Sequence, residues 1–394
     1  MELPKKTVLL VVIIVILGLV FLFRDSFLRM FFIPTSSPIE TGVTMDQVET
    51  KVSDKVNDEV SGKPDIEVVI ENLNIPWELV FLPARAGEPD GRMLITERPG
   101  DLLIIGKDKK TIKVQGVYHF GEGGLLGMAL HPDFQNNNFV YLYFTSSVSG
   151  KVSNRVERYK LIGDTLVDKR TILEEIPGAA NHDGGRLKFG PDGFLYVTTG
   201  DSQNSNLSQD TASLAGKILR VKDDGSIPAD NPFGNAIYSY GHRNVQGIAW
   251  DSGGRLWATE HGRSGVQSGL DEINLIVKGA NYGWPVIQGD QTSVGMFTPV
   301  INSGVSDTWA PSGMVFYEGR LFWAGLRGES LYEATIAEDK LVNLKANFRG
   351  EYGRFRTVVV GPDGYFYVLT NNRDGRGTPK SGDDKIIRIN PQMF

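Results

Sequence analysis

The first strong pattern along the chain is an unbroken apolar run over residues 7–23, which reads TVLLVVIIVILGLVFLF. A helix of this length spans about 26 Å at about 1.5 Å per residue, just enough to cross the apolar core of a bilayer. Two lysines precede the run, whereas an Arg-Asp pair after it nearly cancels. The positive-inside rule therefore predicts a membrane anchor over residues 1–33, with its short N-terminus in the cytoplasm.

A cleaved signal peptide is the alternative reading of this segment. The run is longer than a usual signal-peptide core, and no small-x-small cleavage site follows it. We therefore expect a single-pass protein of the cell membrane whose main domain is extracytoplasmic, either periplasmic or extracellular. Residues 34–65 are polar and contain Pro, Ser and Thr, so we expect a linker between the membrane and that domain.

From residue 66 onward, short β-rich runs alternate with Gly, Asp and Pro. Six of these runs share one form, in which a turn residue precedes a strand of alternating large side chains. They are GRMLITE from Gly91, NFVYLYFT from Asn138, GFLYVTTGD from Gly193, GRLWATEHG from Gly254, GRLFWAGL from Gly319 and GYFYVLTNN from Gly364.

Repeats of this length, with room for about four strands each, are typical of propeller blades. Helical patterns do not separate the strands, which argues against a parallel α/β fold. The sequence therefore predicts an all-β fold, a six-bladed β-propeller over residues 66–394, preceded by an N-terminal transmembrane helix and the polar linker.

Composition narrows the chemistry. The chain has no cysteine, which excludes disulfides, thiolate zinc sites, iron–sulfur clusters and cysteine nucleophiles. Its formal net charge is −6 and no dense Lys/Arg block occurs. Phosphate binding needs a concentrated basic surface, so we expect no nucleic acid among the partners.

Unusual polar clusters fall in loops that a propeller would gather at one end of its channel. They are GEGGLLG at 121–127, NHDGGRL at 181–187, TTGD at 198–201, YGHRNVQG at 240–247, TEHG at 259–262 and GRFRTV at 353–358. Three of the five histidines, His182, His242 and His261, lie in these clusters. A histidine beside a carboxylate suits general-base work.

Two further patterns suggest ligands. Arg354 and Arg356 share one face of a strand, because alternate side chains do, and two guanidinium groups facing one way favour an anionic partner. Salt bridges to neighbouring blades would equally explain either arginine alone. The HExxH zinc motif is missing, whereas Asp271 and Glu272 follow a Gly-rich loop. Hard oxygen ligands in such loops suit calcium.

Together, these loops resemble the soluble, quinone-dependent aldose sugar dehydrogenases, the glucose/sorbosone dehydrogenase family. The resemblance runs from about Ile75 to the C-terminus. Its marks, in order, are GEGGLLGMALHPDF, NHDGGRLKFGPDGFLYVTTGD, AGKILRV, YGHRNVQGIAWD, TEHG with DEINLI, NYGWP, APSGM and RFRTVVVGPDGYFYVLT. The resemblance implies an oxidoreductase that oxidises aldose sugars at C1 to lactones. Hydride would pass to pyrroloquinoline quinone (PQQ), and electrons would then pass to an unknown external acceptor.

The resemblance also implies roles for single residues. His182 matches the general base, Asp201 the carboxylate that orients it, and Arg243 the residue over the reacting quinone oxygen. The residues matching cofactor contacts are Glu122, His182, Arg243, Asn244, Arg327, Arg354 and Arg356. Some relatives carry Gln where Glu122 stands, so this carboxylate near an anionic cofactor needs calcium or an arginine to offset it, or must face away.

By the same resemblance, a catalytic Ca²⁺ would be held by the backbone carbonyls of Gly262 and Arg263. A further, structural Ca²⁺ would use Glu272 and the backbone of Tyr282. Trp309 is a candidate for the sugar entrance, because aromatic faces pack against the C–H surface of a pyranose. A place in the core is the alternative for Trp309.

Two other functions remain open at this point. A calcium-dependent lactonase on a similar scaffold would need Asp, Glu and Asn side chains around one axial metal, and would have no use for Arg354 and Arg356. A non-enzymatic extracellular propeller that binds a ligand or glycan would keep the blades without His182, Asp201 and Arg243 together.

Overall fold

The computed structural model describes residues 39–48, 64–84, 91–265 and 268–394. The predicted anchor over residues 1–33 lies outside these ranges. Within them, no helix combines the length and the apolar character needed to cross a membrane.

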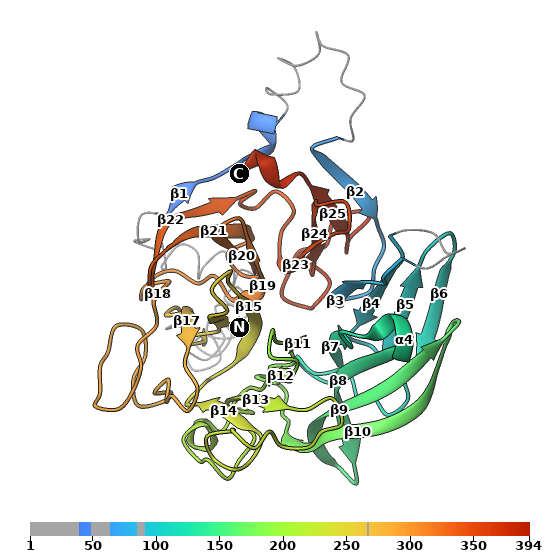
Figure 1. The fold of residues 1–394 in the computed structure, drawn as a ribbon. Coiled ribbons are helices and arrows are strands. Elements are labelled where there is room, and N and C mark those ends of the chain that lie inside the picture. The colour runs from blue at the N-terminus through green and yellow to red at the C-terminus, as the bar shows by residue number, and fades with distance from the viewer. Residues whose placement is uncertain (1–38, 49–63, 85–90, 266–267) are drawn as a thin grey trace, which may run out of the picture.

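Six antiparallel sheets are arranged as blades around a central axis (Figure 1). The first three blades are β3 (Pro76–Phe81), β4 (Met93–Glu97), β5 (Asp101–Ile105) and β6 (Lys109–Lys113); β7 (Leu125–Leu130), β8 (Phe139–Val148), β9 (Lys151–Ile162) and β10 (Thr165–Pro177); and β11 (Leu187–Phe189), β12 (Leu195–Thr198), β13 (Lys217–Val221) and β14 (Ile237–Tyr240).

The chain continues around the ring in the same direction. The next blades are β15 (Val245–Trp250), β16 (Leu256–Glu260), β17 (Glu272–Ile276) and β18 (Ile301–Asn302), then β19 (Pro311–Tyr317), β20 (Arg320–Gly325), β21 (Ser330–Ala337) and β22 (Lys340–Asn347), and last β23 (Phe355–Val360), β24 (Phe366–Thr370) and β25 (Ile386–Ile389). Short helical turns are α4 (Phe134–Asn137), η1 (Ser205–Ser208) and η3 (Pro391–Met393).

Each of the six sequence repeats forms the second strand of a blade, namely β4, β8, β12, β16, β20 and β24. These strands are nearly or wholly buried, because each lies inside a sheet whose two faces pack against neighbouring blades. The predicted all-β, six-bladed propeller is therefore confirmed.

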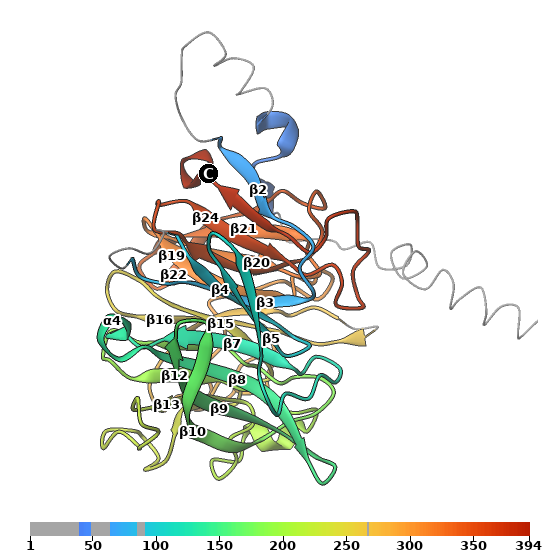
Figure 2. The ribbon, with the colours of Figure 1, turned by 90° about the vertical axis from the view of Figure 1, so that its right-hand side faces the viewer.

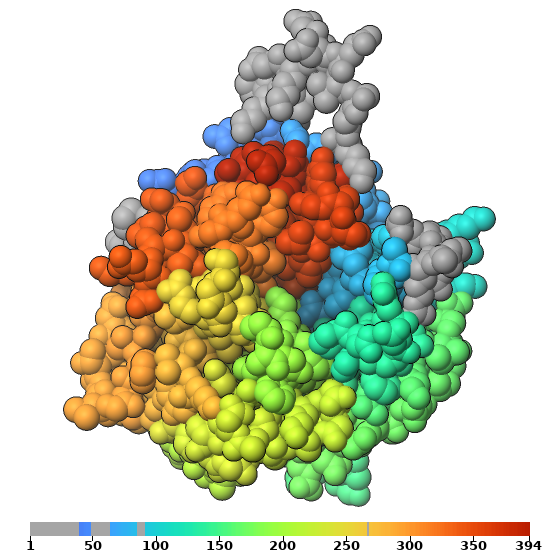
Figure 3. Space-filling model, viewed as in Figure 1, coloured from blue at the N-terminus to red at the C-terminus, as the bar shows by residue number. Residues whose placement is uncertain are grey.

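The ring closes through a strand from the other end of the chain. β2 (Ile66–Ile70) pairs antiparallel with β25 and is the outer strand of the last blade. Figure 2 shows β2 and β24 together at one edge of the ring, and Figure 3 shows the C-terminal blade against the first one. This closure covers the outer edge of β25, and it ties the last blade to residues that precede the first.

Part of the segment predicted as a linker packs on the propeller. β1 (Glu40–Thr41) pairs parallel with β22, and the Phe348 N–H donates to the Val43 carbonyl at 2.8 Å. Val48 lies in a helical stretch and is buried in the apolar core beneath it. Residues 39–48 are therefore an added edge of the fifth blade rather than a free spacer.

The Asp-Gly turns before β12, β16 and β24 have a structural role as well. Asp192 accepts hydrogen bonds from the Tyr196 hydroxyl and from Nε of Arg220, both at 2.9 Å. The turn carboxylate therefore ties the second and third strands of its blade together. The same kind of contact joins Asp363 to Tyr367 and Arg388. Asp251 instead contacts Trp257 and Arg255, which lie in or next to the second strand of its blade.

This arrangement yields a stability prediction for the last blade. The Arg388 side chain is only 3% exposed, and Nε donates to Asp363 at 2.8 Å. We expect Asp363→Ala to lower the free energy of unfolding by about 2–3 kcal/mol, because a buried guanidinium loses its nearest counter-charge. The measurement is urea unfolding followed by circular dichroism.

The matched control is Asp339→Ala, which removes an 81% exposed partner of Arg255. We expect a change below about 0.5 kcal/mol there, as is usual for surface ion pairs. Equal effects of the two substitutions would contradict a structural role for the turn carboxylate.

Candidate functional site

A cavity of about 510 Å³ opens where loops that connect successive blades converge with loops inside the third and fourth blades. Its lining comes mainly from the third and fourth blades. The lining residues are His182, Asp201, Gln203, Ser205, Arg243, Arg263, Ser264, Trp284 and Gln288.

His182, Asp201 and Arg243 form one hydrogen-bonded chain in this cavity. Nδ1 of His182 lies 2.7 Å from Oδ1 of Asp201, and Nε2 lies 2.9 Å from Nη2 of Arg243. A guanidinium can only donate, so Nε2 must accept, and the ring is the neutral tautomer with its proton on Nδ1. The structure thus brings together the three residues predicted as catalytic.

The loops beneath His182 hold its backbone in an unusual conformation. The residue has φ +66°, in the left-handed region that non-glycine residues rarely adopt. A Cβ at Gly200 would lie 1.9 Å from the His182 carbonyl oxygen, so only glycine lets the two loops meet this closely. Oε2 of Glu122 accepts a hydrogen bond from the His182 N–H at 3.0 Å.

Trp284 completes the surroundings of Asp201 and was missed as a site residue in the sequence. Its indole N–H donates to Oδ2 of Asp201 at 2.9 Å, so both carboxylate oxygens have partners. Its ring centre lies 5.3 Å from the Arg243 guanidinium carbon. The NYGWP motif draws attention to this loop, but nothing local shows that the indole meets a carboxylate 83 residues earlier.

Two buried residues, Glu260 and His242, support Arg243 through its backbone. The Glu260 carboxylate accepts from the Arg243 backbone N–H and from Nδ1 of His242, which is fully buried. Burial lowers the pKa of His261 to about 3, and its carbonyl accepts from Nη1 of Arg243 at 3.3 Å. Of the three histidines in the polar loops, His182 is therefore the one that lines the open cavity.

Asn244, predicted as a cofactor contact, links two loops of the site. Its Oδ1 accepts from the Gly184 N–H at 3.0 Å. Its Nδ2 is buried and has no partner. A donor of this kind, enclosed and unpaired, is costly unless something binds it.

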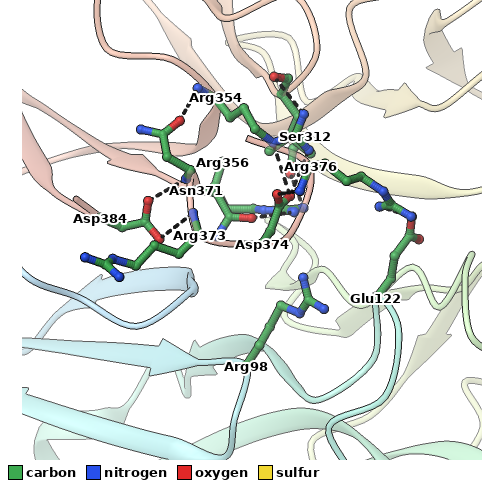
Figure 4. Close-up of polar contacts among 12 residues, drawn as sticks. Arg98, Glu122, Ser312, Arg354, Arg356, Asn371, Arg373, Asp374, Arg376 and Asp384 are labelled. Atoms are coloured by element: carbon green, nitrogen blue, oxygen red, sulfur yellow. Dashed lines mark hydrogen bonds and ion pairs between the residues drawn. The ribbon is translucent and has the colours of Figure 1, made fainter. Parts of the chain in front are cut away.

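The two arginines predicted to face one way differ in their partners. Arg354 donates through Nε and Nη2 to Oδ2 of Asp374, so its charge is already balanced by a carboxylate (Figure 4). Arg356 donates to the neutral amides of Gln246 at 2.7 Å and Asn371 at 3.0 Å. Only one member of the pair thus lacks a carboxylate in direct contact.

Of the two arginines, Arg356 also has the less favourable electrostatic environment for its positive charge. Its Nε is buried without a partner. Burial lowers the pKa of Arg356 to about 9, and the nearby cations Arg98 and Arg354 act in the same direction. An anion brought next to this guanidinium would offset the penalty.

Trp309 and Arg327, both predicted as site residues, are not part of the cavity lining. Trp309 is fully buried and packs with Trp323 and Tyr332, so its place at a sugar entrance is wrong. The aromatic side chain at the cavity is Trp284. The Arg327 side chain is exposed, and its backbone neighbour Leu326 supplies the carbonyl that accepts from Arg354.

The predicted metal ligands divide between two adjoining spaces. Gly262, Glu272 and Tyr282 line an enclosed cavity of about 10 Å³, whereas Arg263 lines the open one. Burial and the nearby Glu260 raise the pKa of the Glu272 carboxyl. Among the described residues, no group of three or more His, Asp and Glu side chains is arranged to hold a metal ion. Any cation here would rely partly on backbone oxygens.

The comparisons with known proteins agree with this geometry. The family model described as Glucose / Sorbosone dehydrogenase matches residues 73–387. Aldose sugar dehydrogenase YliI of Escherichia coli is 34% identical over 365 residues, which are 83% of this chain and 93% of that protein. Quinoprotein glucose dehydrogenase B of Acinetobacter calcoaceticus is 33% identical over 287 residues, covering 62% and 58%.

A solved structure gives the same result. The PQQ-bound form of aldose sugar dehydrogenase from Streptomyces coelicolor matches with a TM-score of 0.74 and 41% identity, covering 82% of this chain and 97% of that one. These findings confirm the resemblance drawn from the loop motifs. The chain belongs to the glucose/sorbosone dehydrogenase family.

Proposed function

We propose that this protein is a quinoprotein oxidoreductase that oxidises aldose sugars with PQQ as its cofactor. Family membership and the names of its relatives support the reaction class. The observation that carries the proposal for this chain is the hydrogen-bonded chain of Asp201, His182 and Arg243 at an open cavity.

In this proposal His182 is the general base. Its Nε2 would take the proton from the C1 hydroxyl of the sugar while the hydrogen on C1 leaves as hydride toward the bound quinone, so that the sugar becomes a lactone. Asp201 holds the imidazole in the required tautomer and stabilises the imidazolium that forms. Arg243 stabilises negative charge that develops beside it.

PQQ, when bound, would supply the acceptor for the two electrons that the sugar loses. The site fits such a group, because Nε of Arg356 and Nδ2 of Asn244 are buried donors without acceptors. The carboxylates and carbonyls of PQQ match these donors in kind. We assign Arg356 and Asn244 to the cofactor, with Arg354 and Arg327 beside them.

We extend the proposal to calcium. Glu260 and Glu272 place carboxylates around the enclosed cavity, whose volume of about 10 Å³ would hold about one water-sized sphere. Oδ1 of Asn274 is buried nearby without a partner. Hard oxygen donors of this kind suit Ca²⁺, and Glu272, Gly262 and the Tyr282 backbone would hold it.

Two further parts of the proposal concern the cell. We propose that residues 7–23 anchor the chain and that the propeller works outside the cytoplasm, which the charge pattern around the apolar run supports. The electrons would then leave to an external acceptor, a quinone or a redox protein.

The first test is reconstitution of the full chain with PQQ and Ca²⁺, followed by sugar-dependent dye reduction. We expect turnover with at least one aldose. We also expect His182→Ala to reduce turnover by about 10²–10⁴, the usual value of one well-placed general base. Near-normal turnover would remove His182 from this role, and no dye reduction with any aldose would favour a binding protein.

Trp284→Phe tests the support of Asp201. The substitution keeps an aromatic ring but deletes the N–H donated at 2.9 Å. We expect kcat to fall about tenfold, because one hydrogen bond to a charged group is lost. Trp309→Phe is the matched control, since its ring is buried outside the cavity. If it lowered kcat equally without loss of folded protein, the special role of Trp284 would be refuted.

Calcium binding can be measured without the reaction. Protein treated with a chelator should gain about 2.7 kcal/mol of stability when calcium is added to about 100 times its Kd. Glu272→Gln should reduce this gain, whereas Asp164→Asn, at an exposed turn, should leave it intact. An unchanged melting temperature when calcium is added to the chelator-treated wild-type protein would contradict the site.

A further inference from the structure

We propose that Glu122 and Arg376 are a pair of positioning residues that hold the left-handed backbone of His182. The inference rests on the proposed role of His182 as the base. It gives Glu122, which the resemblance associates with the cofactor, a different task in this chain.

The contacts form a closed set around residues 181 and 182. Oε1 of Glu122 lies 2.6 Å from Nη1 of Arg376, and Oε2 accepts from the His182 N–H at 3.0 Å. Nη2 of Arg376 donates to Oδ1 of Asn181 at 2.9 Å. Arg376 thus holds the side chain of Asn181, and Glu122 holds the backbone N–H of His182.

His182 needs such support because of its backbone. A non-glycine residue at φ +66° persists only where its surroundings enforce it. From one side the His182 carbonyl is fixed against Gly200, and the Ser202 N–H donates to it at 3.3 Å. Glu122 fixes the N–H of His182 through its hydrogen bond. Both backbone groups of His182 are therefore held, and with them the direction of the imidazole.

The pair also explains how the negative charge of Glu122 can be tolerated beside an anionic cofactor. Burial acts to raise the pKa of Glu122, but Arg376 and the His182 N–H outweigh it and lower this pKa to about 2. Both oxygens of the ionised carboxylate have partners within the protein. Arg376 therefore offsets the charge, and Glu122 need not turn away or bind calcium.

Arg376 reaches the site from the far end of the chain. It lies in the loop between β24 and β25, and Figure 4 shows its side chain extended toward Glu122. Asp374, in the same loop, accepts hydrogen bonds from Arg354, and these contacts fix the part of the loop that carries Arg376. The Arg376 side chain is 53% exposed, so its importance lies in geometry more than in ion-pair energy.

The experiment compares Glu122→Ala, Glu122→Gln and Arg376→Ala in the full chain. The control is Lys278→Ala, which removes a surface ion pair of 2.7 Å with Asp230 in another part of the ring. Hydrogen exchange, read by mass spectrometry on cofactor-free protein, reports on the His182 amide. We expect faster exchange in the peptide with His182 for Glu122→Ala and Arg376→Ala, an intermediate rate for Glu122→Gln, and wild-type exchange for the control.

Kinetics of the reconstituted enzyme give the second readout. We expect Glu122→Ala and Arg376→Ala to lower kcat about tenfold and to change the sugar KM and the PQQ Kd by less than about twofold, because orientation of the base is lost and binding is kept. Glu122→Gln should restore part of kcat, since its one amide oxygen can still accept from the His182 N–H while its NH2 group cannot accept from Arg376.

Three results would overturn the inference: unchanged exchange at His182, kcat values equal to the control, or a large rise in the PQQ Kd for Glu122→Ala, which would make Glu122 a cofactor ligand. If Arg376→Ala does not fold, Arg376→Gln takes its place. Full turnover in His182→Ala would defeat the proposed base, and the exchange data would still decide whether the pair holds this backbone.

Discussion

Closure of the ring is the constraint on which the rest of the structure depends. The site draws on loops that belong to different blades, and no blade contains more than part of it. Pairing of β2 with β25 fixes the last blade against the first. Only then do Arg356 and the β24–β25 loop face the loops that carry Glu122 and His182. The site is therefore a property of the closed ring, and loosening the closure would disperse residues that local structure cannot hold together.

Several guanidinium groups lie near the end of the channel, and they differ in the partners that balance their positive charge. Arg354 has the Asp374 carboxylate, and Arg376 has Glu122. Arg356 donates to the neutral amides of Gln246 and Asn371 and to the Ser312 hydroxyl, and its Nε is unpaired. Buried charge without a counter-charge is costly, so a folded protein keeps it where a ligand will supply the missing charge. This difference favours Arg356, rather than the arginine pair as such, for the anion-binding role proposed above.

The hydrogen-bonded chain of His182, Asp201 and Arg243 is likewise held in place by contacts within the protein. Both oxygens of Asp201 are engaged, by His182 and by Trp284. Arg243 is held through its own backbone by Glu260, which His242 orients. Groups fixed in this way need little reorganisation when charge develops, and preorganisation of that kind is a main source of enzymatic rate. The residues behind the site thus matter through the geometry they impose on those at the cavity.

The local pattern of the sequence was enough to predict six blades and the second strand of each, because alternation of buried side chains and Asp-Gly turns act over a few residues. The family motifs likewise identified His182, Asp201 and Arg243. Contacts across the ring were beyond such reasoning. Trp284 and Trp309 both lie in loops near a proline, yet one reaches the cavity and the other is core. The counter-charge of Glu122 comes from a residue 254 positions later. Local chemistry determines which side chains are suited to a task, whereas closure of the ring decides which of them meet.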